Sequence, residues 1–332
     1  MSSQSNEMAL MAPAPHDFKA PVFPDNKLVL YFHPYNFYSQ KVLLVLYEKN
    51  IDFTPYIIDL CNGEQYSSWF LNLNPKGDVP VLQDGVFVIP NSPEIISYVD
   101  TKYRGEEHPV LKPYNPYSLQ YDQMMVFERA FSRVPVGTLS LGSLIHDDLK
   151  LVPKAPFIGP VRQSCLKNND KVMELLRSSL SDLNSQNVAL KQKLEIQMRR
   201  KDLVSTRSEF QRVLDAVRNT LLFVEQELSK QREHSDWWLT GEQFTVADVS
   251  LCLLLQRLHQ LGFENYYWTN DKLPRVEQYF QRCRLRGSYV KLMPSSNFDI
   301  LREMWSMTPT NYKLGATAGF LGMAMFAAFA HK

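Results

Sequence analysis

The stretch WFLNLNPKGDVPVLQDG, from Trp69 to Gly85, contains the clearest structural signal in the chain. Apolar residues on both sides of its Asp84-Gly85 pair predict two short strands joined by a tight hairpin. Around it, residues 27–105 alternate strand-like apolar runs with two helical segments, expected from Ser39 to Lys49 and from Pro93 to Tyr103. This order predicts a compact α/β domain in which helices cover a small mixed sheet.

The composition limits the functions open to this chain of 332 residues. Its 36 basic and 35 acidic residues give a net charge of +1, which argues against a protein that binds nucleic acid by neutralising phosphates. No nucleic-acid partner is therefore expected. The cysteines lie far apart and form no CxxC pair, so neither a metal site nor a redox dithiol is expected. They are Cys61, Cys165, Cys252 and Cys283.

Beyond residue 106 the strand-like patterns give way to helical ones, which continue to about residue 295. The clearest lies in QFTVADVSLCLLLQRL, residues 243–258. Thr245 and Asp248 have the spacing of a capping box, and Phe244 before them is placed as a hydrophobic staple. The pattern predicts a second, all-helical domain over residues 106–295.

A long basic insertion is expected within the helical domain, over residues 140–206. From residue 150 to 212 there are 13 basic and 6 acidic residues. Apolar residues recur at spacings of four and three with Asn187 in one place, which predicts a short coiled coil with a buried amide. A second apolar face over residues 209–228 predicts its antiparallel partner. The first seam consists of Val172, Leu176, Leu180, Leu183, Leu190 and Leu194.

Two interpretations of this insertion remain open from the sequence. It is either a self-packed hairpin with a solvated basic surface, or a docking arm for an acidic protein partner or an anionic membrane.

The two ends of the chain differ in character. Residues 1–26 are rich in proline and predict a flexible leader. Residues 313–332 predict a tail anchor, because Leu314 to Ala330 carry no charge and make about 26 Å of helix, at the short end of a membrane span. The alternative is a buried core helix. Residues 296–312 predict an amphipathic membrane-proximal segment, or one that packs on the folded body.

The Trp69 to Gly85 block and the capping box resemble the glutathione transferases, over residues 27–105 and 207–293. The resemblance implies a thioredoxin-like N-terminal domain and a helical C-terminal domain. It also implies that Pro80 is cis, with the backbone of Val79 pairing with glutathione; the alternative is a purely structural turn. Ser92 would hold the γ-glutamyl carboxylate at a helix N-terminus, unless it only caps that helix.

The same resemblance identifies departures from the transferase pattern. Asn36 falls where serine-type transferases have the catalytic hydroxyl, Asn91 replaces a glutamate or glutamine, and Asp78 adds an unfavourable charge for an anionic ligand. Tyr38 and Ser39 are the candidate catalytic hydroxyls, with Tyr35 nearby. Ser39 is alternatively the N-cap of the first helix, and His33 is interpreted as a loop histidine rather than a base.

The long insertion and the apolar tail together resemble the ganglioside-induced differentiation-associated protein 1 family. That resemblance implies a protein in the mitochondrial outer membrane, with its bulk facing the cytosol, or in peroxisomes, that influences organelle fission. A glutathione-conjugating enzyme and a non-catalytic thiol or electrophile sensor remain as alternatives. No cofactor is expected beyond glutathione as substrate or ligand, and a homodimer is possible by analogy.

Overall fold

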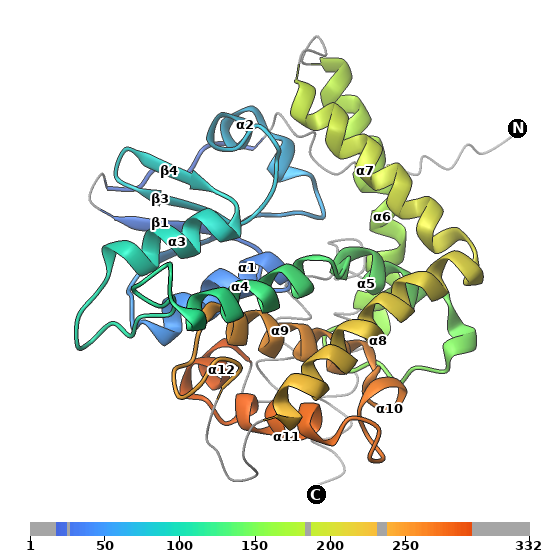
Figure 1. The fold of residues 1–332 in the computed structure, drawn as a ribbon. Coiled ribbons are helices and arrows are strands. Elements are labelled where there is room, and N and C mark those ends of the chain that lie inside the picture. Colours follow the sequence, from blue (N-terminus) through green and yellow to red (C-terminus); the bar gives the residue numbers. More distant parts are fainter. Residues whose placement is uncertain (1–17, 25–26, 183–186, 231–237, 294–332) are drawn as a thin grey trace, which may run out of the picture.

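The computed structural model describes residues 18–24, 27–182, 187–230 and 238–293 (Figure 1). The first unit is built around a four-stranded sheet of order β2-β1-β3-β4. Strand β1 pairs parallel with β2 and antiparallel with β3, and β3 pairs antiparallel with β4. The predicted hairpin joins the last two strands. The elements are β1 (Leu28–Phe32), α1 (Phe37–Glu48), β2 (Thr54–Ile57), η2 (Glu64–Tyr66), α2 (Ser68–Leu73), β3 (Val81–Asp84), β4 (Phe87–Pro90) and α3 (Ser92–Lys102).

The sheet is covered on both faces, because alternate side chains of β1 enter two different cores. Leu30 and Phe32 pack with the apolar residues of α1 and α3. Val29 and Tyr31 pack on the other face, where Phe70 of α2 completes the core. The predicted thioredoxin-like arrangement of one small mixed sheet between helices is confirmed.

The second unit is all-helical in its described residues, as the sequence predicted, and α9 lies at its centre (Figure 1). Nearly every residue of α9 is buried, which explains the apolar run that follows its cap. The elements are α4 (Leu119–Ser132), α5 (Val136–Ile145), η3 (Asp147–Leu149), α6 (Gly159–Asp182), α7 (Val188–Ser205), α8 (Arg207–Ser229), α9 (Val246–Leu261), α10 (Glu264–Tyr267), α11 (Pro274–Arg284) and α12 (Gly287–Leu292).

The predicted capping box at the start of α9 is confirmed. Asp248 Oδ2 accepts hydrogen bonds from the backbone N–H and the hydroxyl of Thr245, both at 2.7 Å. Its Oδ1 accepts from Leu239 N at 2.8 Å and from Tyr279 Oη at 2.6 Å. Asp248 is fully buried, so these bonds also tie the loop before α9 and helix α11 to the cap.

The basic insertion forms helices α6 and α7, but their packing differs from the prediction. Helix α8 does not pair with the predicted seam; its apolar face packs in the main core, from Phe210 to Leu228. The seam residues Leu176, Leu180 and Leu190 instead pack with Tyr66 and Leu71 of the first unit. The insertion is therefore a hairpin laid against the thioredoxin-like domain, beside α2 in Figure 1.

Asn187 is not the buried amide that the spacing predicted. It is the N-cap of α7, where its Oδ1 accepts from Leu190 N at 3.1 Å. Its amide nitrogen donates to the carbonyl oxygen of Pro75 at 3.1 Å, which adds a contact with the first unit. Asparagine suits both roles, since it is among the best N-cap residues and its amide nitrogen is free to donate.

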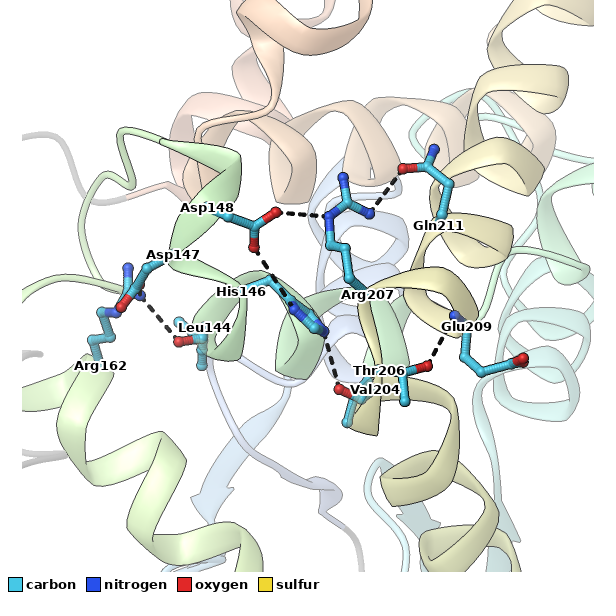
Figure 2. A network of polar contacts seen from close by, with 10 residues as sticks. All are labelled: Leu144, His146, Asp147, Asp148, Arg162, Val204, Thr206, Arg207, Glu209 and Gln211. Carbon is cyan, nitrogen blue, oxygen red and sulfur yellow. Dashed lines mark hydrogen bonds and ion pairs between the residues drawn. The ribbon is translucent and has the colours of Figure 1, made fainter.

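The base of the hairpin is fixed to the end of α5 and the start of α8 by polar contacts (Figure 2). Arg162 of α6 donates to the carbonyl oxygen of Leu144 at 3.0 Å and to Asp147 at 2.5 Å. Arg207 of α8 donates to Asp148 at 2.9 Å. These arginines belong to the basic excess in the sequence, and in the structure they form ion pairs within the molecule.

The ends of the chain lie largely outside the described residues. Of the predicted leader, residues 18–24 are described, and Phe23 packs edge-on against Tyr31 and Tyr56. Within the described ranges, no helix has both the length and the apolar character needed to cross a membrane. The predicted segments 296–312 and 313–332 lie outside those ranges.

Candidate functional site

A cavity of about 600 Å³ lies between the thioredoxin-like domain and the helical domain. Its walls come from three parts of the chain: the thioredoxin-like unit, helices α4, α5 and α9, and the insertion helices α6 and α7. Six of the seven predicted site residues line it together. They are Asn36, Tyr38, Val79, Pro80, Asn91 and Ser92.

The turn before β3 places Val79 and Pro80 at the cavity, and the Val79–Pro80 peptide bond is cis as the resemblance implied. Asn74 fixes the turn by donating from its amide nitrogen to the carbonyl oxygen of Asp78 at 2.9 Å. Gly77 has a φ of +57°, and an added Cβ there would lie 2.8 Å from the Gln65 carbonyl oxygen, so this position requires glycine.

The start of α3 brings Asn91 and Ser92 to the same cavity. Asn91 is the N-cap, and its Oδ1 accepts from Glu94 N at 3.2 Å. Its φ of +65° suits asparagine better than serine. The interpretation of Ser92 as the cap is therefore wrong, because Ser92 is the first helical residue. Its buried side chain lines the cavity beside the N-terminus of α3.

The start of α1 differs from the prediction in the same way. The helix begins at Phe37, and its cap is Asn36, whose Oδ1 accepts from Ser39 N at 2.9 Å. Ser39 is consequently not the cap. Its hydroxyl is buried and accepts from His33 N at 3.3 Å, and Ser39 is not among the described residues lining the cavity. Tyr38 lines the cavity and is half-exposed.

His33 and Tyr35 support the loop that precedes α1. The Nδ1 atom of His33 accepts from Tyr35 N at 3.3 Å. Burial lowers the pKa of His33 to about 4, which keeps the ring neutral at physiological pH. The carbonyl oxygen of Tyr35 accepts from Arg257 of α9 at 2.7 Å. These contacts agree with the interpretation of His33 as a loop histidine.

The insertion adds residues to the cavity that the sequence did not reveal. Lys193, Gln197 and Arg200 line it from α7, and Val172 lines it from α6. Lys193 pairs with Asp78 at 2.7 Å and thereby neutralises the charge that looked unfavourable for an anionic ligand. The basic excess of the insertion and the lone Asp78 were both visible in the sequence, but nothing in it brought them together.

Helices α1, α4 and α9 close the opposite side of the cavity with a second polar group. Lys41 pairs with Glu128 at 3.6 Å, and Ser250 donates to the same carboxylate. Apolar residues of α4, of α5 and of the turn between these helices adjoin them and give this side of the cavity an apolar floor. These are Phe131, Val134 and Val136.

The described residues contain no group of three or more histidine, cysteine, aspartate or glutamate side chains placed to hold a metal ion. Cys252 and Cys283 are buried, and burial raises the pKa of the Cys283 thiol.

The fold and this cavity define a glutathione-transferase-like protein. Two family models match the chain: the glutathione S-transferase N-terminal domain over residues 37–102 and the glutathione S-transferase C-terminal domain over residues 207–282. The chain resembles the beta-etherase LigF from Sphingobium sp. strain SYK-6, with a TM-score of 0.59 and 21% identity over 80% of this chain and 98% of that one. The nitrogen regulation fragment of the yeast prion protein Ure2p gives a TM-score of 0.57 and 17% identity, over 83% and 100% of the two chains.

Within that class, the chain resembles ganglioside-induced differentiation-associated protein 1-like 1. It is 27% identical to the human protein over 88% of this chain and 81% of the human one. It is 25% identical to glutathione S-transferase TCHQD of Arabidopsis thaliana, over 80% and 88% of the two chains. The predicted resemblance to the ganglioside-induced differentiation-associated protein 1 family is confirmed. The insertion lies between the two segments that the transferase models match.

Proposed function

We propose that this protein binds glutathione in the cavity between its two domains and conjugates it to small electrophiles. The proposal rests on one observation: the cis Val79–Pro80 turn and Ser92 line the same cavity of about 600 Å³. Volumes of this order suit small-molecule ligands. The match to both transferase domains supports the proposal at the level of the family.

Each part of the ligand has a candidate partner in the cavity. The backbone of Val79 would pair with the cysteinyl group, as an added strand pairs with a sheet edge. The Ser92 hydroxyl and the N-terminus of α3 would hold the γ-glutamyl carboxylate, since free N–H groups and the helix dipole favour an anion there. Asn91 is the cap of α3, so its Oδ1 is already occupied.

The thiol would lie near the start of α1, beside Asn36 and Tyr38. In the conjugation step the thiolate sulfur attacks an electrophilic carbon, a carbon–sulfur bond forms, and the bond to the leaving group breaks. The apolar floor of α4 and α5 would receive the electrophile. Of the two predicted hydroxyls, that of Tyr38 lies on a residue lining the cavity, whereas Ser39 is buried and is not among the described lining residues. A sensor that binds glutathione without turnover uses the same contacts.

Replacing Ser92 by alanine tests the binding mode. We expect Ser92→Ala to weaken glutathione binding to the purified full-length chain about tenfold or more, because a hydrogen bond to a charged group is lost. Isothermal titration calorimetry measures the affinity, and turnover of a generic electrophile in the same sample separates an enzyme from a sensor. Ser229→Ala, at the exposed end of α8, is the control. Absence of binding by the unmodified chain would exclude the proposal.

We also propose that residues 314–330 anchor the protein in the mitochondrial outer membrane, with the folded domains facing the cytosol. The uncharged sequence of this segment and the similarity to ganglioside-induced differentiation-associated protein 1-like 1 support this proposal. In that location the basic insertion and residues 296–312 would contact a protein partner or the membrane surface and influence organelle fission. Several basic residues of the insertion already have partners within the chain, which limits the surface left for docking.

Deleting residues 314–330 tests the anchor. We expect a tagged full-length chain to collect on mitochondria and the deleted chain to spread through the cytosol, because the membrane segment is lost. Fluorescence microscopy with mitochondrial and peroxisomal markers distinguishes the two organelles. A control chain with the segment scrambled in order but unchanged in composition should remain bound to membranes. Mitochondrial localisation that survives the deletion would contradict the proposal.

A further inference from the structure

The α6–α7 hairpin is fastened to the thioredoxin-like domain at the edge of the glutathione cavity. Lys193 of α7 donates to the carbonyl oxygens of Lys76 and Gly77 at 3.1 and 2.6 Å, and it pairs with Asp78 at 2.7 Å. Lys171 of α6 donates to Asn62 at 3.1 Å. The apolar cluster of the hairpin with Tyr66 and Leu71 lies alongside these bonds. The hairpin is thus a wall of the cavity held at several points.

Helix α7 directs one polar face into that cavity. Lys193, Gln197 and Arg200 follow one another at spacings of four and three, which places them on the same side of the helix. All three line the cavity. Arg200 donates from Nη1 to Gln197 Oε1 at 3.0 Å, so the guanidinium is oriented by its neighbour one turn earlier.

Gly137 in the first turn of α5 provides the space for Arg200. An added Cβ at Gly137 would lie 1.6 Å from Arg200 Nη2. The end of α7 is also held in place, because His146 at the end of α5 contacts the carbonyl oxygen of Val204 at 3.0 Å (Figure 2). The position of the guanidinium therefore follows from contacts on two sides of the helix.

The charges in the cavity distinguish Arg200 from the other two cations. Lys41 pairs with Glu128 and Lys193 pairs with Asp78, whereas the hydrogen-bond partner of Arg200 is a neutral amide. Burial lowers the pKa of Arg200, and the nearby Tyr38 phenol raises it. An arginine stays protonated at neutral pH, so the cavity keeps an excess positive charge on the side of Tyr38.

We infer that Arg200 of the insertion holds the sulfur of bound glutathione as a thiolate. It would replace the catalytic hydroxyl that serine-type transferases have at the position of Asn36. This inference rests on the proposed glutathione site. The S–H bond breaks heterolytically, the proton passes to solvent water, and the electron pair stays on the sulfur beside the guanidinium. Arg200 remains protonated throughout and acts by electrostatic attraction, which favours the ionised form of a group close to it.

The thiolate absorbance of bound glutathione, measured against pH, tests the inference on the full-length protein. In Arg200→Gln we expect the ionisation midpoint to rise by about one pH unit or more. The affinity for S-methylglutathione, which cannot ionise, should stay unchanged. Arg200→Lys should restore part of the shift because it keeps the charge. Arg199→Gln, at the exposed neighbouring position, is the matched control and should behave like the unmodified chain.

A second variant moves the guanidinium without removing it. Gly137→Ala places a methyl group where Arg200 Nη2 lies, and the flexible arginine side chain has to shift. Alanine is favoured in a helix, so we expect the fold to persist while the ionisation midpoint rises. Circular dichroism checks the fold of each variant.

The outcomes separate this inference from the proposed function. A midpoint unchanged in Arg200→Gln would overturn the inference and leave glutathione binding intact. An equal loss of affinity for glutathione and S-methylglutathione, with no midpoint shift, would also overturn it and make Arg200 a carboxylate anchor. If the unmodified chain bound no glutathione, the proposed function and this inference would both fail.

Discussion

Asp248→Ala should lower the free energy of unfolding by about 3–5 kcal/mol, the largest loss expected from a single substitution in the helical domain. The carboxylate is fully buried and accepts four hydrogen bonds, from Leu239 N, Thr245 N, Thr245 Oγ1 and Tyr279 Oη. Burial raises its pKa, and these hydrogen bonds oppose that rise. Alanine leaves two buried backbone N–H groups and two hydroxyls without an acceptor.

Thermal unfolding of the purified full-length chain measures this effect. A loss of that size corresponds to a decrease of roughly 10 °C in the melting temperature of a protein of this length. Asp122→Ala is the matched control, because Asp122 also lies in the first turn of a helix but is exposed. The control should cost less than about 1 kcal/mol. Equal effects of the two substitutions would show that the buried network does not hold α9, α11 and the preceding loop together.

The capping box also shows which features of the fold could be predicted from the sequence. Local patterns with a fixed spacing, such as Thr245 and Asp248 or the turn at Asp84-Gly85, gave elements that the structure confirms. Their geometry depends on residues close together in the chain. The thioredoxin-like and helical domains could therefore be assigned with few errors of element type.

Which of two neighbouring polar residues caps a helix could not be predicted equally well. Asn36 and Asn91 cap their helices, although serines in the same segments are alternative caps from the sequence. Asparagine and serine have similar cap preferences, so propensity does not distinguish them. The positive φ of Asn91 is a property of the folded turn, and it favours asparagine for a reason that local spacing does not reveal.

The insertion was the least predictable part of the candidate site. The spacing of Leu176, Leu180 and Leu190 correctly indicated apolar helix faces, but periodicity does not identify what covers a face. Their partners, Tyr66 and Leu71, lie more than one hundred residues earlier in the chain. For the same reason nothing in the sequence distinguishes Arg200 from the other basic residues of the insertion, although it lines the cavity.

A buried ion pair of the first domain holds the segment through which the chain passes to the second domain. Lys49 at the end of α1 donates from Nζ to Asp100 Oδ1 of α3 at 3.0 Å and to the carbonyl oxygen of Pro109 at 2.6 Å. Asp100 also accepts from the backbone N–H groups of Leu111 and Lys112, at 2.9 and 3.2 Å. Both members of the pair are almost completely inaccessible to solvent.

Lys49→Met is expected to reduce the free energy of unfolding by about 3–5 kcal/mol, because it leaves the Asp100 carboxylate buried without its cation. Methionine has a similar length, so the loss reflects charge rather than a large cavity. Lys102→Met provides the contrast: Lys102 of α3 pairs with Asp84 of β3, but the Lys102 side chain is 42% exposed and its loss should cost less than about 1 kcal/mol.

The double variant Lys49→Met, Asp100→Asn separates the charge effect from the packing effect. Asparagine keeps an oxygen for the Leu111 N–H group and removes the unpaired charge, so we expect the double variant to be more stable than Lys49→Met alone. Chemical unfolding of the three variants and the unmodified chain gives the coupling energy. A double variant less stable than Lys49→Met would mean that the packing of Lys49 and the hydrogen bonds of Asp100, rather than the balance of charge, hold the interdomain segment in place.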